Sequence, residues 1–85
     1  MIKVLFFAQT RELVGIDSVD LDGQFDTVEA VRAHLVEAGA EKAGKWDLAL
    51  EPGKLLAAVN QSIAPLDTQV KAGDEVAFFP PVTGG

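Results

Sequence analysis

The chain has 85 residues, of which 48% are hydrophobic and 24% charged, and this composition predicts a single globular domain without repeats. Its formal net charge of -6 argues against nucleic acid and anionic membrane as partners. The absence of Cys excludes disulfides, thiolate metal sites and an internal sulfur nucleophile. The longest apolar stretch, residues 4–8, is too short to span a bilayer and no signal peptide opens the chain, so we expect a cytoplasmic protein.

The first predicted element is a strand over residues 2–7, where β-favouring apolar residues alternate. The face that should point to the core carries Ile2, Val4 and Phe6. Lys3 marks the opposite face as the wetter one, which leaves Leu5 and Phe7 as apolar residues on the outside. After a polar turn around Gly15, residues 17–22 alternate again, so the two strands are expected to form a hairpin.

One clear helix is expected over residues 25–39. Asp26 or Thr27 can cap its start, and Gly39 suits a left-handed exit at its end. Apolar residues recur along it at spacings of three and four, as Val28, Val31 and Leu35. This single stripe can lie across one face of a sheet.

The second half of the chain predicts further strands separated by turns. An alternating, strand-like pattern is formed by Trp46, Leu48 and Leu50. Two more strands are expected over residues 55–59 and 75–79, each preceded by a turn, over residues 51–54 and 71–74. The last strand should end where Pro80 begins, because proline cannot donate to a sheet hydrogen-bond ladder.

Two strands, one helix and then more strands is the element order of an α+β fold of the ubiquitin-like β-grasp type. We expect a mixed sheet with one main helix packed on one face. Residues 75–79 are apolar on both faces, so this last strand should lie centrally. Residues 1–85 would form a single domain, with residues 80–85 as an extended, functional C-terminal tail.

The body of this domain offers no obvious catalytic group. Residues 39–45 fit the first positions of a phosphate-binding loop, but a helix precedes them and Trp46 occupies the magnesium-ligand position. His34 is the single histidine, and without Cys it cannot complete a nucleophilic pair or a common metal set. No spacing of carboxylates singles out an acid and base pair. We therefore expect no bound metal or cofactor, and no catalysis by the chain alone.

The most informative segment is the C-terminal one, residues 79–85, with the sequence Phe-Pro-Pro-Val-Thr-Gly-Gly. Pro80 and Pro81 should hold the chain extended and away from the sheet. Gly84 and Gly85 then present a backbone without side chains. Such a peptide can enter a narrow channel and bring a terminal carboxylate close to reactive groups.

These features resemble the family of molybdopterin synthase small subunits over nearly the whole chain. The matching segments are residues 1–8, 27–30, 55–61 and, most specifically, 73–85. The resemblance implies that an adenylating and sulfurating partner uses ATP to convert Gly85 into an acyl adenylate. A sulfur donor then displaces AMP and leaves a thiocarboxylate on Gly85.

The resemblance also implies the partner that receives the sulfur. The tail would enter the synthase large subunit, where the terminal sulfur attacks cyclic pyranopterin monophosphate. Two such transfers build the dithiolene of molybdopterin, and the assembly is expected to contain two large and two small subunits.

The strand pattern predicts a docking surface for these partners. Phe79 should share the outer face with Leu5 and Phe7 if the first and last strands are neighbours, and exposed apolar faces of this kind mark interaction sites. The predicted partner-binding residues are these three and the tail residues Pro80, Pro81, Val82 and Thr83.

Three alternatives remain open at the level of sequence. The sulfur carrier of thiazole biosynthesis has a similar fold and terminal chemistry, although the Phe79–Pro81 spacer argues against it. A ubiquitin-like modifier would instead join Gly85 to lysines of other proteins. A plain interaction domain would carry an idle tail.

Overall fold

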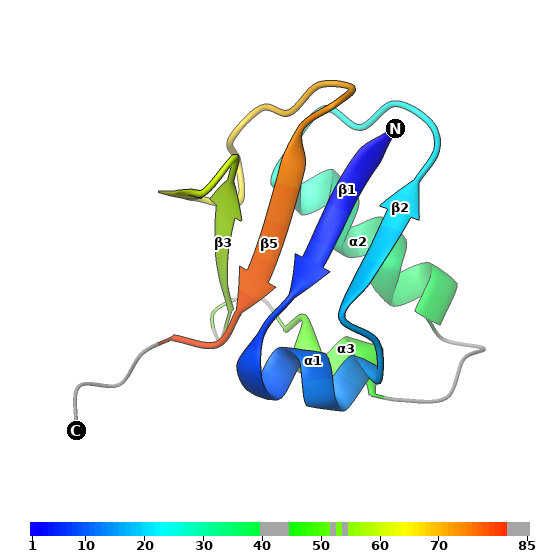
Figure 1. The fold of residues 1–85 in the computed structure, drawn as a ribbon, viewed down its shortest axis with the longest axis vertical. Coiled ribbons are helices and arrows are strands. Elements are labelled where there is room, and N and C mark those ends of the chain that lie inside the picture. The colour runs from blue at the N-terminus through cyan, green and yellow to red at the C-terminus, as the bar shows by residue number, and fades with distance from the viewer. Residues whose placement is uncertain (40–44, 52, 54, 82–85) are drawn as a thin grey trace.

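The computed structural model describes residues 1–39, 45–51, 53 and 55–81 of the chain. In this part of the chain, one sheet and three helices form a single body (Figure 1). The strands are β1 (Ile2–Phe6), β2 (Ser18–Leu21), β3 (Leu56–Val59), β4 (Ser62–Ala64) and β5 (Glu75–Phe79). The helices are α1 (Ala8–Val14), α2 (Val28–Gly39) and α3 (Trp46–Ala49). Among the described residues, no helix has the length and apolar character needed to cross a membrane.

The sheet is mixed, as predicted. Its strand order is β2-β1-β5-β3-β4, so β5 lies in the middle. β1 and β5 run parallel, with Phe6 opposite Phe78, whereas the pairs β1–β2, β3–β5 and β3–β4 are antiparallel. The central position of the last strand is therefore confirmed. The two apolar faces of β5 differ in their surroundings, since Val76 and Phe78 are fully buried in the core whereas Ala77 and Phe79 lie on the opposite face of the sheet.

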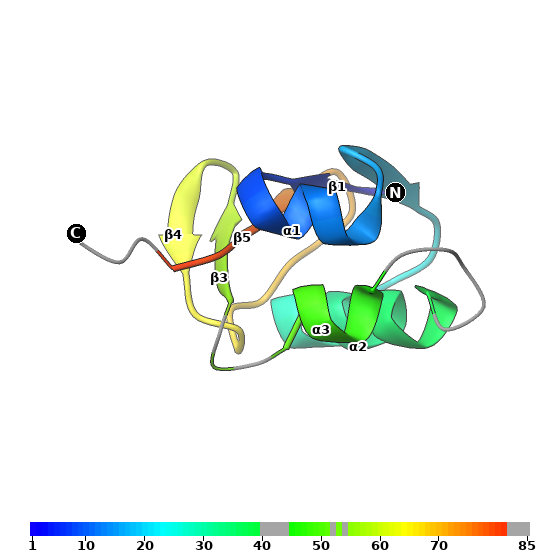
Figure 2. The same ribbon diagram turned by 90° about the horizontal axis from the view of Figure 1, so that it is seen from below.

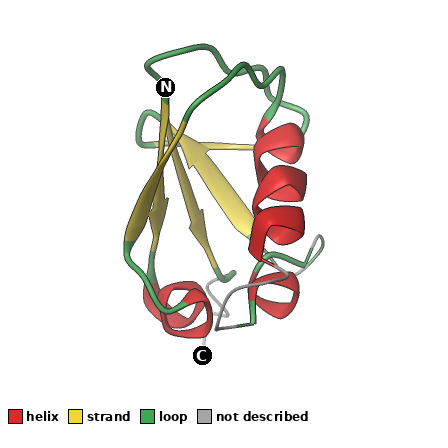
Figure 3. Cartoon of the chain, turned by 90° about the vertical axis from the view of Figure 1, so that its right-hand side faces the viewer, coloured by secondary structure: helices red, strands yellow, loops and turns green. Residues whose placement is uncertain are grey.

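Helix α2 covers one face of the sheet and leaves the other face uncovered by any helix (Figure 3). The predicted core residues of β1 and α2 are all buried: Ile2, Val4, Phe6, Val28, Val31 and Leu35. At the centre of this core the Phe6 ring stacks on Phe78 and meets Trp46 edge-on, with ring centroids 6.5 and 5.6 Å apart. This α+β arrangement is the one expected from the order of the elements.

The structure changes the sequence prediction at both ends of α2. Thr27 caps the start, because its Oγ1 accepts a hydrogen bond from the Ala30 N–H at 3.1 Å, and the helix begins at Val28 rather than at residue 25. At the other end, the predicted left-handed exit at Gly39 is wrong, because Gly39 is the last helical residue and is absent from the glycines with positive φ. A Cβ built on Gly39 would lie 2.4 Å from the Trp46 ring, so close packing requires glycine here.

The predicted polar turn is present only at Gly15 itself, because a helix that the sequence analysis does not predict fills residues 8–14. Helix α1 is followed by Gly15, which has φ 87° and donates its N–H to the Arg11 carbonyl at 2.9 Å. The buried Thr10 and Val14 and the half-buried Leu13 form a helical stripe. β1 and β2 do pair antiparallel as predicted, but through a helical connection.

A third correction concerns Trp46, Leu48 and Leu50. They do not form a strand, since residues 46–49 are the short helix α3. Trp46, Ala49 and Leu50 are buried at spacings of three and four, whereas Leu48 is 53% exposed. Arg32 of α2 holds the end of this helix, because its Nη1 donates to the Leu50 carbonyl at 3.0 Å.

Two turns at the end of the sheet opposite the tail contain residues with a left-handed backbone. β4, which the sequence analysis does not predict, pairs with β3 through Asn60 and Gln61, whose φ values are 50° and 72°. The predicted turn over residues 71–74 is confirmed, with Gly73 at φ 92°. Asp74 accepts hydrogen bonds from the Lys71 backbone N–H at 2.9 Å and the Asn60 side chain at 3.2 Å. These bonds lower the pKa of the Asp74 carboxyl, the Lys71 bond having the larger effect.

Candidate functional site

The end of β5 is the root of the predicted functional tail. The last β3–β5 pair is Leu56 with Phe79, so the strand ends where Pro80 begins, as predicted. Pro80 is half-buried and Pro81 exposed, and Figure 1 shows residues 80–81 running on from β5, away from α1. The predicted site residues Val82, Thr83, Gly84 and Gly85 lie outside the described residues.

The uncovered face of the sheet contains a hollow of about 460 Å³, which we call the outer groove. It is lined by Leu5, Phe7, Ala58, Gln61, Ile63, Glu75, Ala77 and Phe79. The predicted grouping of Leu5, Phe7 and Phe79 on one face is therefore confirmed. It arises because β1 and β5 are parallel neighbours, with Leu5 opposite Ala77. The Phe7 N–H donates to the Phe78 carbonyl at 3.1 Å and so keeps Phe7 beside the end of β5.

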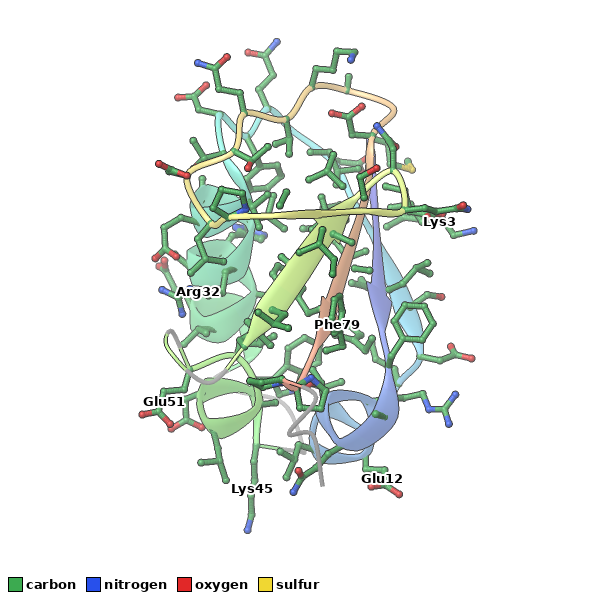
Figure 4. All side chains as sticks on the ribbon, turned by 90° about the vertical axis from the view of Figure 1, so that its left-hand side faces the viewer. Lys3, Glu12, Arg32, Lys45, Glu51 and Phe79 are labelled. Atoms are coloured by element: carbon green, nitrogen blue, oxygen red, sulfur yellow. The ribbon has the colours of Figure 1, made fainter. Side chains whose placement is uncertain are left out.

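The outer groove is apolar toward the tail and polar toward the opposite end. Phe7 is 46% exposed and Phe79 half-buried near the end of β5, and Figure 4 shows the Phe79 side chain on this face. Glu75 lies at the start of β5, opposite Lys3 of β1. The groove can therefore accept apolar side chains close to the tail and polar ones farther away.

Sequence analysis missed Ile63, which is the most exposed large hydrophobic side chain in the outer groove at 73%. It lies on β4, at the edge of the sheet. The signal that could have found it is the pair Asn60–Gln61, a turn signal that joins two short alternating stretches.

A second hollow of about 220 Å³ lies between α1 and α3 at the root of the tail, and we call it the helix groove. It is lined by Gln9, Thr10, Leu13, Leu48, Ala49, Glu51 and Pro80. Figure 2, viewed from this end of the molecule, shows α1 and α3 beside the end of the sheet, and the two helices contact each other. Because sequence analysis predicted neither helix, it could not predict this groove.

The described residues contain no group of three or more His, Cys, Asp or Glu that could hold a metal ion. His34 is exposed on α2 and packs edge-on against Phe25 with ring centroids 5.2 Å apart. The pKa of Glu29 is lowered chiefly by its hydrogen bonds from Arg32, one of which, from Nε, is 2.7 Å long. That pair lies on α2, so it supports packing on the covered side of the sheet. The segment 40–44, which contains most of the phosphate-loop pattern, lies outside the described residues.

Comparison with known proteins agrees with the family resemblance that the sequence analysis found. The profile of the ThiS family matches residues 4–85. The chain is 62% identical to the molybdopterin synthase sulfur carrier subunit of Haemophilus influenzae and 60% identical to that of Escherichia coli. Both alignments cover 100% of this chain and 100% of the relative.

Solved structures show the same fold. The crystal structure of small archaeal modifier protein 1 from Haloferax volcanii is 32% identical, with a TM-score of 0.66, over 95% of this chain and 97% of that one. A complex of subunits 1 and 2 of the molybdopterin-converting factor from Helicobacter pylori contains a chain that is 24% identical, with a TM-score of 0.61, over 99% and 97% of the two chains. The ubiquitin-like β-grasp prediction is confirmed.

Proposed function

The chain belongs to the ThiS family, and we propose that it is the sulfur carrier subunit of a molybdopterin synthase. The observation that carries this proposal is the identity of 62% and 60% to two curated sulfur carrier subunits in alignments that cover all of this chain and all of each relative. This identity favours molybdenum cofactor biosynthesis over the thiazole pathway, because both relatives are named for the former.

The proposed chemistry takes place at the carboxylate of Gly85. A carboxylate is a poor electrophile, so an oxygen of Gly85 first attacks the α-phosphorus of ATP on an adenylating partner, and pyrophosphate leaves. A sulfur nucleophile then attacks the carbonyl carbon, the bond to AMP breaks, and a thiocarboxylate remains. Because activation consumes ATP, the proposed cycle takes place in the cytoplasm.

The sulfur is then delivered inside a complex. The tail enters the large subunit, and the terminal sulfur attacks cyclic pyranopterin monophosphate to form the molybdopterin dithiolene in two transfers. We propose an assembly of two large and two small subunits. The name of the Helicobacter pylori complex, which pairs a structurally similar chain with a second subunit, supports a large-subunit partner.

In this proposal the chain positions its C-terminal tail and lets it enter the partner's channel, and it supplies no acid or base groups. Pro80 and Pro81 restrict the backbone at the root of the tail, so less conformational entropy is lost when the tail is bound. Gly84 and Gly85 lack Cβ atoms and fit a narrow channel. The outer groove, with Leu5, Phe7 and Phe79, is the proposed docking surface for the partners.

A second candidate function is conjugation to other proteins. The likeness to small archaeal modifier protein 1 favours it, since that protein is named as a modifier. Gly85 would then form an isopeptide bond with a lysine instead of a thiocarboxylate. Covalent adducts of the chain with other proteins in cells would identify this function.

The proposed function is tested by reconstitution. The thiocarboxylated chain is mixed with the large subunit and cyclic pyranopterin monophosphate, and formation of molybdopterin is measured by mass spectrometry. We expect product from the full chain and none from a variant lacking Gly85. Absence of product from the full chain, together with sulfur transfer in a parallel thiazole synthase assay, would refute the assignment.

A further inference from the structure

The outer face of the two central strands is ordered in three levels. β1 and β5 run parallel, so residues of the two strands lie side by side along their length. The three pairs on the outer face, from the start of the strands toward the tail, are Lys3 with Glu75, Leu5 with Ala77, and Phe7 with Phe79. The face therefore has a charged level, a level with one large and one small apolar residue, and an aromatic level.

The charged level continues onto the neighbouring strands. Lys3 lies opposite Asp20 of β2, and the Asn60 N–H donates to the Glu75 carbonyl at 2.8 Å. The order across the sheet is Asp20, Lys3, Glu75 and Asn60. No ion pair within the described part of the chain uses Lys3, Asp20 or Glu75, so these charges remain available to another molecule.

The other charges near this face are accounted for within the chain. In the turn before β5, the Lys71 Nζ lies 3.7 Å from Asp74 Oδ1. The amino-terminal residue Met1 is held beside the same turn, because its carbonyl accepts a hydrogen bond from Gly73 at 2.9 Å. Figure 4 shows three further charged residues at the tail end of the molecule, far from Lys3: Glu12, Lys45 and Glu51.

The pattern on this face is complementary to a second copy of itself. A two-fold axis that runs parallel to the strands, between β1 and β5, places β1 of each copy over β5 of the other, as in two sheets packed face to face. Each level then meets the same level of the second copy. The contacts across the axis are Lys3 on Glu75, Leu5 on Ala77, and Phe7 on Phe79.

The flanking residues fit the same arrangement. Asp20 would face the neutral Asn60 of the second copy rather than a carboxylate. The outer groove offers room for the Leu5 side chain of the second copy, because Ala58 and Ala77 are small neighbours on β3 and β5 and both line the hollow. Packing of large side chains onto small ones is what a close interface needs.

The alternative two-fold axis on this face, perpendicular to the strands, is unfavourable. It would place the charged level of each copy over the aromatic level of the other. Charges would then lose water without gaining an opposite charge, which is costly. Charge complementarity therefore selects the axis parallel to the strands.

The contact between copies should be weak. An interface of standard size buries about 800 Å² on each partner, roughly one seventh of the 5248 Å² surface of this chain. Only Phe7 and Ile63 are large, well-exposed apolar side chains among the described residues of the outer groove. Each copy also has a net charge of -6, which opposes association.

We propose that the free chain forms a transient homodimer through the outer face of β1 and β5, in which Lys3 of each copy pairs with Glu75 of the other. The dimer covers the outer groove, so it must dissociate before that groove can bind another protein. This inference concerns the chain alone and does not require the proposed sulfur chemistry.

Charge reversal tests the proposed pairing, with sedimentation velocity over a range of concentrations as the measurement. Lys3→Glu or Glu75→Lys alone places like charges at two symmetric contacts, so we expect the dimer to weaken roughly tenfold. The double variant should restore it. Lys45→Glu is the matched control, because it makes the same change in charge at an exposed position at the tail end and should dimerise like the unaltered chain.

Mixing the two single variants separates contacts between copies from contacts within one chain. In the mixed dimer, residue 3 of each copy faces a residue 75 of opposite charge. The mixture should therefore associate more strongly than either variant alone, although both variants keep a net negative charge. Thermal unfolding confirms that each variant is folded.

The inference would be overturned by an unaltered chain that stays monomeric up to about 1 mM, where weak complexes still form. It would also be overturned by a dimer that the single reversals leave unchanged, or by single variants that neither mixing nor combination restores. All of these results would leave the proposed function intact, because the gain of sulfur at Gly85 is measured separately.

Discussion

Gly39 shows how a single missing Cβ decides the packing of two helices. It ends α2 under the Trp46 side chain, and a Cβ there would meet three Trp46 atoms at 2.4 to 2.7 Å. The contact is side chain against helix backbone in a buried site, so neither partner can move away cheaply. Close approach, rather than backbone freedom, explains the glycine.

Replacing Gly39 with Ala should therefore destabilise the protein. Helix propensity alone would raise the free energy of unfolding by at most about 1 kcal/mol. The collision with Trp46 should outweigh that gain and lower the free energy of unfolding by about 1 to 3 kcal/mol, as overpacking does. Urea denaturation followed by Trp46 fluorescence measures the change.

Ala38→Gly is the matched control at the exposed neighbouring position, where only propensity acts and a loss of at most about 1 kcal/mol is expected. A gain in stability for Gly39→Ala would show that Trp46 does not press on this position.

At the scale of elements, the turn that joins β3 and β4 has an unfavourable backbone conformation. Asn60 and Gln61 both have positive φ, as in the type I′ turns that join paired strands. Asn tolerates this conformation, and the Asn60 side chain also bonds to Asp74 and to the Glu75 N–H. Gln61 has a Cβ that opposes the left-handed backbone, and among the described residues its side chain makes no compensating hydrogen bond.

Gln61→Gly should stabilise the hairpin. Relief of left-handed strain exceeds the entropy cost of glycine, so the free energy of unfolding should rise by about 0.5 to 1 kcal/mol. Thermal and urea unfolding measure it. In the control Ser62→Gly, at a position within β4, the same substitution should lower stability instead. Equal losses for both variants would contradict the turn assignment.

The elements with a long apolar pattern were predictable. β1 and α2 carry a periodicity that matches their buried faces, and β3 and β5 are continuous apolar runs. Helix α1 was missed because its stripe includes the polar Thr10, and α3 was taken for a strand because the exposed Leu48 makes Trp46 and Leu50 appear to alternate. In segments of four to seven residues, one residue on the wrong face is enough to reverse the predicted period.

The candidate site also has parts that the sequence predicts and parts that it does not. The outer face with Leu5, Phe7 and Phe79 was predictable, because it follows from strand alternation and one parallel pairing. The helix groove and Ile63 were not, since they depend on α1, α3 and β4. The proposed role of the tail rests on its composition and on a family resemblance, which short-range periodicity does not supply.

At the scale of the whole molecule, the sheet has one face covered by helix α2 and one face that no described helix covers (Figure 3). Helix α2 lies on one side of the sheet (Figure 3), and the residues that line the outer groove lie on the other. β5 runs through the centre of the sheet and ends at the tail. A partner that docks on the outer groove therefore holds the strand from which the tail departs.

Phe7→Asp should weaken association with the large subunit while the domain stays folded. Phe7 is 46% exposed, so the core loses little, but a charge in the apolar part of the groove cannot be desolvated cheaply. We expect affinity to fall roughly tenfold or more, as at an interface hot spot. Titration calorimetry measures it, with Phe7→Leu as a control that keeps the surface apolar. Unchanged affinity of folded Phe7→Asp would exclude the outer groove as the docking surface.

The central claim is that Gly85 carries sulfur as a thiocarboxylate. Its most direct test is the intact mass of the chain after incubation with the adenylating partner, ATP and a sulfur source. We predict a gain equal to the replacement of one oxygen by sulfur, located at Gly85 by fragmentation and absent when ATP is omitted or Gly85 is deleted. An unchanged mass under conditions in which the partner sulfurates a related carrier would contradict the account.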